Sequence, residues 1–333
     1  MWKRVLLWIV LCAIVVGGGT VAWLVLRRPS QVAAAAIKVP MTPERIARGK
    51  YIFQNLADCA GCHSQRDFSR VAGPEVVSGR GRGNVLSDMM HSLPGTVVAP
   101  NITPDPETGI GKWTDGEKIR AIREGVDRDG RALFPMMPYT QYRNMSDEDV
   151  QAVVAFLDSL PPVRYPLPVT RLNFPVNVFI KFAPQPSGSV PPPNHGDTLK
   201  YGEYLVTIGG CVDCHTPQQK GQPVPGMDFA GGQPFPTTLG TVVSANITSD
   251  LDTGIGKWDE DFFLKKFGEY RDYAEQGPPP SPGPQAFTLM PWLGMSHLEP
   301  ADLKAIYAYL RTVKPVRHYV ERHPGAPVKT ASR

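Results

Sequence analysis

The chain has 333 residues, 42% of them hydrophobic, which is enough to bury more than one core and suggests two domains. Residues 1–28 hold four basic and no acidic residues, and the remaining 31 basic residues balance 31 acidic ones. No basic stripe forms, which argues against nucleic acid as a partner. The 35 prolines and 32 glycines predict many loops.

The N-terminus predicts a membrane helix. The 22 residues from 5 to 26 carry no charge, and as a helix they would extend about 33 Å, enough to cross a bilayer core. A cleaved signal peptide usually has a shorter apolar region, although Ala33–Ala36 could offer a cleavage site. We expect residues 1–28 to be an uncleaved anchor, with a cleaved signal as the alternative.

The rest of the chain contains an internal repeat. Five landmarks occur twice in the same order: a helical phrase, Cys-x-x-Cys-His, an Asn-Ile-Thr segment, Met-Pro-aromatic and a closing helical pattern. This order predicts a duplicated domain. We expect the first domain over residues 44–162, a proline-rich linker over 163–196 and the second domain over 197–320. The copies differ in length between motif and Asn-Ile-Thr segment and at Gly277–Pro284, where we expect surface loops.

The predicted secondary structure is almost entirely helical. Each copy closes on a helix whose apolar residues fall at i, i+3, i+4 and i+7: Val150, Val153, Val154 and Leu157, then Leu303, Ile306, Tyr307 and Leu310. Ser146 is placed to cap the first of these helices. The acidic runs at 147–149 and 259–261 are interpreted as solvated helix starts. Alternating strand patterns are scarce, so we predict an all-α fold.

Each copy contains one Cys-x-x-Cys-His motif. The motifs comprise Cys59, Cys62 and His63, and Cys211, Cys214 and His215. Within one helical turn, two thiols can add to the vinyl groups of a haem while the histidine ligates the iron. The sequence therefore predicts two covalently attached haem c groups. Two alternatives stay open: three ligands of a structural zinc site, and a thioredoxin-like redox motif, although its βαβ context is missing.

The second axial ligand of each iron is predicted to be a methionine. A thioether favours reduced iron, but most methionines only pack in cores. Met137 and Met290 recur at matching positions, each before Pro-aromatic and each between motif and closing helix. Met136 corresponds to Leu289, so we predict that it packs. His91 is the alternative distal ligand in the first copy.

The two Asn-Ile-Thr segments, residues 101–113 and 246–258, are predicted to be structural. Their Gly-Ile-Gly steps allow tight backbone turns near a bulky ring. Trp113 and Trp258 could donate to a haem propionate or to a main-chain carbonyl. Residues 249–254 faintly match a calcium loop, without its bidentate glutamate.

Together these motifs resemble the cytochrome c subunits of membrane-bound bacterial dehydrogenases, which include those of alcohol and gluconate dehydrogenases. The resemblance covers roughly residues 44–320. It implies an N-terminal transmembrane helix followed by two tandem cytochrome c domains. It also implies that His63 and Met137 ligate the first haem iron and His215 and Met290 the second. Many members of this group carry three haem motifs, whereas this sequence has two.

The resemblance implies electron transfer rather than an enzyme. The chain would relay single electrons from a periplasmic or membrane dehydrogenase toward quinone, another cytochrome or an oxidase. Because haem c is attached outside the cytoplasmic membrane in such bacteria, we expect a single-pass inner-membrane anchor with the haem domains in the periplasm. The alternative is a dihaem, peroxidase-like enzyme with one open iron position and acid/base groups beside it. A zinc-binding anchor protein is a third hypothesis.

Overall fold

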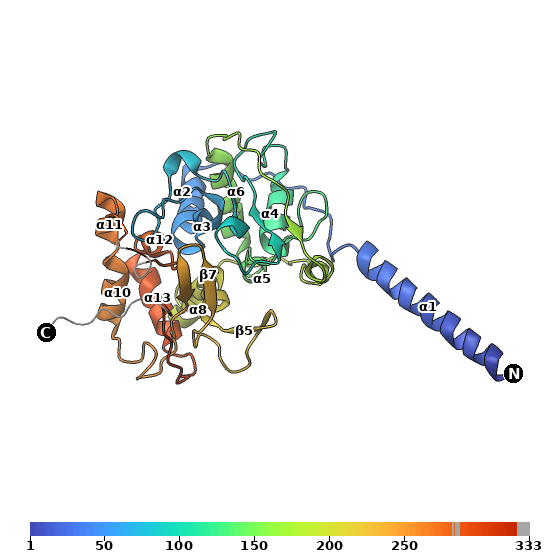
Figure 1. Ribbon diagram of the computed structural model, residues 1–333. Coiled ribbons are helices and arrows are strands. Elements are labelled where there is room, and N and C mark those ends of the chain that lie inside the picture. The colour runs from blue at the N-terminus through green and yellow to red at the C-terminus, as the bar shows by residue number, and fades with distance from the viewer. Residues whose placement is uncertain (282, 284–286, 325–333) are drawn as a thin grey trace.

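The computed structural model describes residues 1–281, 283 and 287–324 (Figure 1). Helix α1 (Trp2–Leu26) extends away from the body of the protein and has no buried residue. Among the described residues, it is the one helix that is long and apolar enough to cross a membrane. It covers the whole charge-free stretch from which the sequence predicted a membrane helix.

The helices that carry the repeated landmarks follow the same order in both copies, while the short helices between them differ. The first contains α2 (Pro43–Tyr51), η1 (Ile52–Leu56), α3 (Cys59–His63), η2 (Val77–Gly79), η3 (Leu86–Asp88), α4 (Asp115–Glu124), α5 (Tyr139–Tyr142) and α6 (Asp147–Ser159). The second contains α8 (Thr198–Ile208), α9 (Cys211–His215), α10 (Glu260–Gly268), α11 (Arg271–Gln276), α12 (Trp292–Met295) and α13 (Pro300–Leu310). The predicted all-α class with two tandem domains is confirmed.

The described strands form four antiparallel two-stranded ribbons. They are β1 (Asn84–Val85) with β3 (Val98–Ala99), β2 (Gly95–Thr96) with β4 (Arg171–Leu172), β5 (Gln218–Gln219) with β6 (Gln222–Pro223), and β7 (Pro234–Thr237) with β8 (Gly240–Val243). The longest strands have four residues. These ribbons stiffen loops, and the helices provide the core.

Each domain is built on two helices that cross at a glycine. A Cβ atom on Gly49 of α2 would lie 1.8 Å from the carbonyl oxygen of Ala152 in α6. A Cβ on Gly202 of α8 would lie 2.0 Å from the carbonyl oxygen of Ala305 in α13. Because real Cβ contacts are never this short, only glycine permits the backbones to approach so closely.

The closing helices follow their predicted patterns. The Ser146 hydroxyl accepts the Asp149 N–H at 3.1 Å and so caps α6, and the apolar face predicted for this helix is buried. The interpretation of residues 147–149 as solvated was wrong for Asp149, which is 6% exposed. Helix α2 covers this end of α6, and Arg48 forms two hydrogen bonds to the Asp149 carboxylate, at 2.7 and 2.8 Å.

A one-residue difference between the copies is absorbed by a π-helical turn. One more residue separates Tyr51 from Cys59 than separates Tyr204 from Cys211. In the first copy the helix widens into the π-helical turn η1, whereas the corresponding part of α8 remains α-helical. A single inserted residue is the usual origin of such a turn. The π-helical turn absorbs the extra residue, so that Tyr51 and Tyr204 keep equivalent positions relative to the motifs that follow them.

The loops that differ in length between the copies meet at the domain interface. The N–H of Val71 donates to the Pro279 carbonyl at 3.0 Å, and the N–H of Ser281 donates to the Ser69 carbonyl at 2.8 Å. Of the predicted surface loop Gly277–Pro284, Pro282 and Pro284 lie outside the described residues. The described part of this loop does more than cover a surface, because it joins the second domain to the first.

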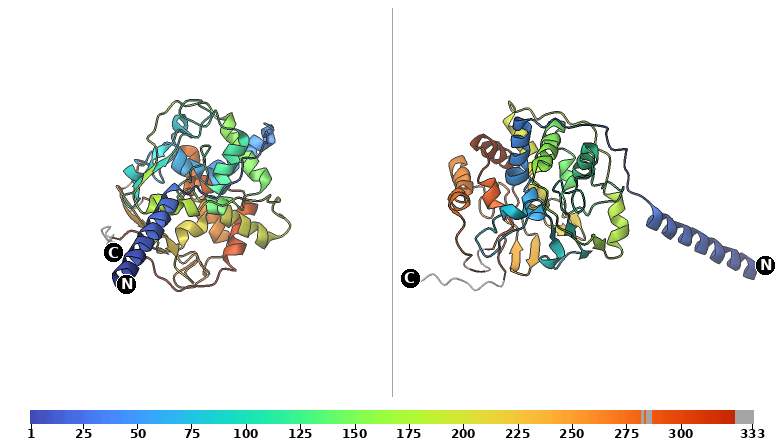
Figure 2. Two further views of the ribbon diagram at one scale, coloured as in Figure 1. Left: turned by 90° about the vertical axis from the view of Figure 1, so that its right-hand side faces the viewer. Right: turned by 90° about the horizontal axis from the view of Figure 1, so that it is seen from above.

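The proline-rich linker lies along the first domain (Figure 2). Its strand β4 pairs with β2 of that domain. Further on, Arg123 donates to the Gly188 carbonyl at 2.6 Å and to the Asp147 carboxylate at 2.5 Å. Between these points the linker forms α7 (Val176–Phe179) and η4 (Ile180–Phe182), close to the end of α1. The linker is therefore packed against the first domain over much of its length.

The two domains share one apolar core. A single cluster of buried side chains contains residues of both copies, among them Phe53 and Leu56 from the first and Leu205 and Ile208 from the second. These four side chains are at most 1% exposed. The motif helices α3 and α9 follow directly after these segments, so the shared core sets how the motifs lie relative to each other.

Candidate haem sites

Each Cys-x-x-Cys-His motif forms a short helix that follows a left-handed residue. Helix α3 begins after Asp58, whose φ is 44°, and α9 begins after Gly210, whose φ is 62°. This backbone conformation turns the chain sharply out of the preceding helix, and glycine and aspartate are among the residues that tolerate it. The two motifs therefore start in the same way, although the residue before them differs.

The motif histidines are held in one tautomer by the backbone. The Nδ1 atom of His63 lies 2.8 Å from the carbonyl oxygen of Pro100, and that of His215 lies 2.7 Å from the carbonyl oxygen of Ala245. A carbonyl can only accept, so Nδ1 carries the proton and Nε2 keeps its lone pair. Burial lowers the pKa of both imidazoles, outweighing these hydrogen bonds. Both rings are thus neutral, as a metal ligand must be.

The Asn-Ile-Thr segments position those carbonyls, since Pro100 and Ala245 directly precede their asparagines. Asn101 donates to the Val163 carbonyl at 2.7 Å, and Asn246 donates to the Val316 carbonyl at 2.8 Å. Each segment is thereby tied to the chain that follows its closing helix. The predicted structural role is supported, and it acquires a specific purpose, which is to orient the histidine.

The glycines of these segments close tight turns, as predicted, but on the backbone of the segment itself. A Cβ on Gly109 would lie 2.3 Å from the Thr103 carbonyl oxygen, and a Cβ on Gly254 would lie 2.3 Å from the Thr248 carbonyl oxygen. The Asp250 carboxylate accepts the Thr253 N–H at 2.7 Å. This carboxylate is therefore part of a turn, as in an Asx-type loop, rather than of a calcium loop.

The four motif cysteines are all free thiols, of which Cys59, Cys62 and Cys211 are partly buried and Cys214 is exposed. Burial raises the pKa of Cys62 to about 11. It also raises the pKa of Cys59, Cys211 and Cys214, each to about 12. Thiol–disulfide exchange needs a thiolate, so the raised thiol pKa values disfavour the redox alternative. Over residues 1–281, 283 and 287–324, no three Cys, His, Asp or Glu side chains converge as a metal-ligand group.

Met137 and Met290 occupy matching turns. The Met137 carbonyl accepts the Tyr139 N–H at 2.8 Å, and the Met290 carbonyl accepts the Trp292 N–H at 2.8 Å. The intervening proline has φ −79° in both turns, with ψ of 49° and 55°, which is the inverse γ-turn conformation. Both methionines are half-buried against the main core cluster. Two sulfur-bearing side chains thus leave identical backbone geometry.

The other candidates in the first copy have different surroundings. Met136 packs against a smaller apolar cluster of Leu86, Val97 and Ala99, which Cys62 of the motif also contacts, and this fits its predicted packing role. His91 is exposed on the surface. The assignment of Met137 and Met290 as distal ligands stays a prediction. The residues present fit haem c in each domain, because a pair of free thiols adjoins a neutral imidazole with an available Nε2.

The two motifs face each other across the domain interface. Gln141, in α5 of the first domain, donates to the Asp213 carboxylate inside the second motif at 3.0 Å. The Cys62 thiol is close enough to Cys214 to contribute to its raised pKa, after burial and Asp213. Helix α12 of the second domain packs tightly on η1 of the first, since a Cβ on Gly294 would lie 2.3 Å from the Gln54 carbonyl oxygen.

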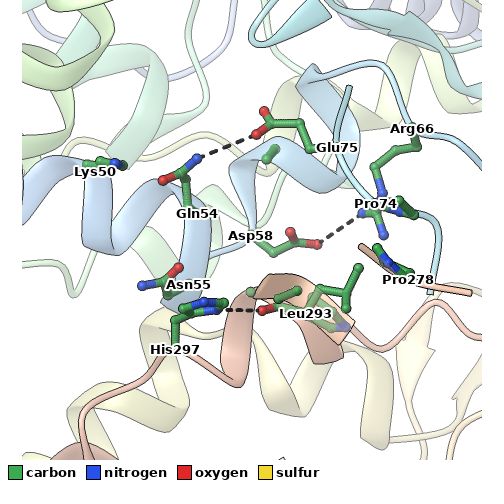
Figure 3. Close-up of a pocket in the computed structure, with 14 residues that line it drawn as sticks. Lys50, Gln54, Asn55, Asp58, Arg66, Pro74, Glu75, Pro278, Leu293 and His297 are labelled. Atoms are coloured by element: carbon green, nitrogen blue, oxygen red, sulfur yellow. Dashed lines mark hydrogen bonds and ion pairs between the residues drawn. The ribbon is translucent and has the colours of Figure 1, made fainter. Parts of the chain in front are cut away.

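A cavity of about 460 Å³, lined by both charged and apolar side chains, lies beside the first motif, between the domains (Figure 3). Asp58, Arg66 and Glu75 from the first domain line it together with His297 from the second. Burial raises the pKa of Asp58 to about 6, although Arg66 opposes the shift. None of the predicted haem-attaching or iron-ligating residues lines this cavity, although Ala60 of the first motif and Pro291, which follows Met290, do.

Comparison with known proteins identifies the repeated unit. The sequence model of the cytochrome c family matches residues 46–161 and again residues 199–314. The chain is 30% identical over 288 residues to the cytochrome c subunit of a quinone alcohol dehydrogenase from Gluconacetobacter polyoxogenes. That alignment covers 81% of this chain and 56% of the relative. It is 33% identical over 280 residues to the fructose dehydrogenase cytochrome subunit from Gluconobacter japonicus, and this alignment covers 80% of this chain and 52% of the relative.

A third relative matches along most of its own length. This protein, a dihaem cytochrome c-type protein from Cereibacter sphaeroides, is 34% identical over 278 residues, covering 80% of this chain and 85% of the relative. In contrast, the chain spans about half the length of the two dehydrogenase subunits. The resemblance to cytochrome c subunits of dehydrogenases is confirmed. Because the family model matches twice and covers most of the sequence, the chain belongs to the cytochrome c family, with two cytochrome c domains in tandem.

Proposed function

We propose that this chain is a membrane-anchored dihaem cytochrome c that relays single electrons from a partner dehydrogenase toward the respiratory chain. The observation that carries the proposal is the duplicated site: each domain holds a neutral motif histidine, by its Nδ1, on a backbone carbonyl. In this proposal the domains extend over residues 44–162 and 197–320, joined by the linker 163–196. The chain has no catalytic residues of its own.

Each domain would hold one haem c. Cys59 and Cys62 would form the thioether bonds of the first group, and Cys211 and Cys214 those of the second. His63 and Met137 would ligate one iron, and His215 and Met290 the other. When bound, haem c supplies a reversible one-electron couple, and a His/Met ligand pair raises its potential. The chain's residues orient the ligands and exclude water, while the prolines after both methionines stiffen the turns.

The interface supports transfer between the two groups. Helix α5 of the first domain reaches the motif of the second, where Gln141 donates to Asp213. The shared apolar core keeps this arrangement rigid. Electron transfer asks the protein for ligation, burial and a fixed spacing of cofactors rather than for a substrate pocket. A single chain could therefore accept an electron at one site and release it at the other.

The relatives and α1 support the proposed partners and location. The alcohol and fructose dehydrogenase relatives are named as cytochrome subunits of those enzymes, which supports a periplasmic or membrane dehydrogenase as donor. Quinone, another cytochrome or an oxidase would be the acceptor. Helix α1 would anchor the chain by a single pass in the bacterial inner membrane, with both haem domains in the periplasm. That placement keeps the haem domains close to acceptors in or on the membrane.

The test is to produce the full chain in a host that matures haem c, and then to count and characterise its haems. We expect a denaturation-resistant mass increase of two haems and a low-spin spectrum for both irons. We also expect reduction by the membrane dehydrogenase of the source organism and reoxidation by its quinone or oxidase. A high-spin haem that binds peroxide would instead indicate a dihaem enzyme, and a colourless protein containing zinc would contradict haem binding altogether.

A further inference from the structure

Three phenylalanines of the linker are exposed, and one of them, Phe182, lies beside the end of α1. Phe174 is 81% exposed, Phe179 is 60% exposed and Phe182 is 38% exposed. They lie on and around α7 and η4, which both ribbon views show next to the C-terminal end of α1 (Figures 1 and 2). We call residues 174–182 the aromatic segment. Exposed apolar clusters of this kind usually mark a surface that contacts another apolar partner.

The aromatic segment is attached directly to the last turn of α1. The ring of Phe182 lies 6.2 Å from that of Trp23, and the Arg27 guanidinium lies 4.1 Å from the Phe182 ring centroid. Lys181 donates to the Val25 carbonyl at 2.6 Å. This carbonyl belongs to the last turn of α1, whose final carbonyls lack intrahelical partners. The segment and the end of the helix therefore form one surface.

The length of α1 sets the depth at which this surface lies. A helix of 25 residues extends about 37 Å, whereas the hydrocarbon core of a bilayer is about 30 Å thick. Its last turn therefore reaches the headgroup region, where tryptophan is enriched. Side chains that contact Trp23 and Val25 must lie at a similar depth.

The charges around the segment fit a lipid surface. Lys181 comes from the segment, and Arg27 and Arg28 directly follow α1. Basic residues beside aromatic ones are typical of protein surfaces that insert between headgroups, because anionic lipids attract the cations while the rings enter the acyl boundary. A protein partner would not require this grouping at the depth of the helix end.

We propose that the aromatic segment inserts into the interfacial layer of the bilayer and acts as a second membrane contact beside α1. The proposal rests on the proposed membrane anchor. A single helix leaves the body free to swing about the chain between Arg27 and the first domain. A second contact from the linker, which is itself packed on the first domain, restricts that motion. It would hold the haem domains at a fixed face and height above the membrane.

The experiment uses the full chain with its haems, in vesicles of phosphatidylcholine and phosphatidylglycerol. A phospholipid with a photoactivatable diazirine near the top of its acyl chain is included, and labelled peptides are mapped by mass spectrometry. We expect labelling within α1 and within residues 174–182. Exposed apolar residues remote from α1, such as Leu251, which is 60% exposed, should not be labelled.

The outcomes separate this proposal from the anchor. Labelling of α1 without residues 174–182 overturns the second contact and leaves the anchor standing. Absence of label from α1 overturns both. The double variant Phe174→Asp and Phe179→Asp should reduce labelling of its peptide several-fold while α1 labelling is unchanged. The matched variant Leu251→Asp should change neither. A cross-link between copies at residues 174–182, without lipid label, would assign the surface to a second chain and overturn the proposal.

Discussion

The hydroxyl of Tyr51, in the first domain, donates to the carboxylate of Asp302 in the second domain at 2.6 Å. The equivalent residues repeat the contact in the opposite direction, because Tyr204 of the second domain donates to Asp149 of the first at 2.6 Å. In each case the tyrosine oxygen also accepts a backbone N–H from the other domain. The domains are therefore joined by a reciprocal pair of buried contacts.

The two contacts should differ in strength. Asp149 also binds Arg48, whereas among the described residues the Asp302 carboxylate accepts only from the hydroxyls of Tyr51 and Tyr201. Removing one donor from a buried carboxylate costs about 1–3 kcal/mol, and the loss is harder to compensate at Asp302. We expect Tyr51→Phe to lower the free energy of unfolding by more than Tyr204→Phe does, as measured by denaturant titration of the haem-containing protein. The control is Tyr319→Phe, at a residue that is 81% exposed; equal stability of all three variants would refute the prediction.

The paired methionines of the first copy provide an internal control. Met137→Leu should abolish the sulfur-to-iron charge-transfer band of one haem and lower the potential of that haem alone. The fall should be on the order of 0.1 V, within the range of about 0.8 V over which axial ligands set haem potentials. Met136→Leu should leave spectrum and potential unchanged, and Met290→Leu should affect the other haem. Redox titration with optical detection measures all three variants. A spectral change in Met136→Leu, or none in Met137→Leu, would show that the ligand is misassigned.

The glycine crossings make a prediction about stability. Gly49→Ala and Gly202→Ala each place a methyl group within 2.0 Å of a facing carbonyl oxygen, so the helices must separate. Overpacking of this kind typically costs about 1–3 kcal/mol, and these contacts belong at the upper end. Thermal unfolding should show a lowered midpoint for both variants. Gly268→Ala, at a helical glycine with no atom within 4 Å, is the matched control and should be neutral or stabilising. The prediction is wrong if Gly49→Ala and Gly202→Ala have the same unfolding midpoint as Gly268→Ala.

Docking of the linker should depend on pH through Asp147. Burial would raise the pKa of this carboxyl, but hydrogen bonds from Ser189 and Val190 and the Arg123 guanidinium lower it below its ordinary value of 3.8. A lowered pKa means that the stabilisation is present above that ordinary value and is lost as pH falls through the folded-state pKa. The protection of the amides of residues 187–190 against hydrogen exchange, taken relative to the intrinsic exchange rate at each pH, should therefore be high at neutral pH and fall below about pH 4.

The variant Asp147→Asn isolates this effect. It should loosen residues 187–190 already at neutral pH and flatten the acid response. Glu124, which also binds Ser187, is retained in both proteins, so the difference between them belongs to Asp147. The control is Asp129→Asn, whose side chain is 68% exposed. Identical exchange profiles for Asp147→Asn and the parent would remove Asp147 from the docking contact.

Much of the fold could be predicted because the sequence contains its own comparison. The repeat singled out Met137 over Met136 and defined both closing helices. What the sequence could not indicate were contacts made by backbone or across the interface. The Pro100 carbonyl that holds His63 has no side-chain signature. Asp149 was misinterpreted because an acidic residue at a helix start usually faces water, and nothing local revealed Arg48 beside it. Tyr51 and Asp302 are 251 residues apart, and only the folded chain brings them together.

The shared apolar core has a consequence for how this protein can move. Domains connected by a proline-rich linker often move relative to each other. Here the linker is packed on the first domain, and the second domain shares an apolar core with the first through Phe53, Leu56, Leu205 and Ile208. Separating the two domains would expose a large apolar surface on each of them. Under the proposed function, regulation of electron flow would therefore act at the outer faces, where donor and acceptor would bind, rather than through a hinge between the two halves.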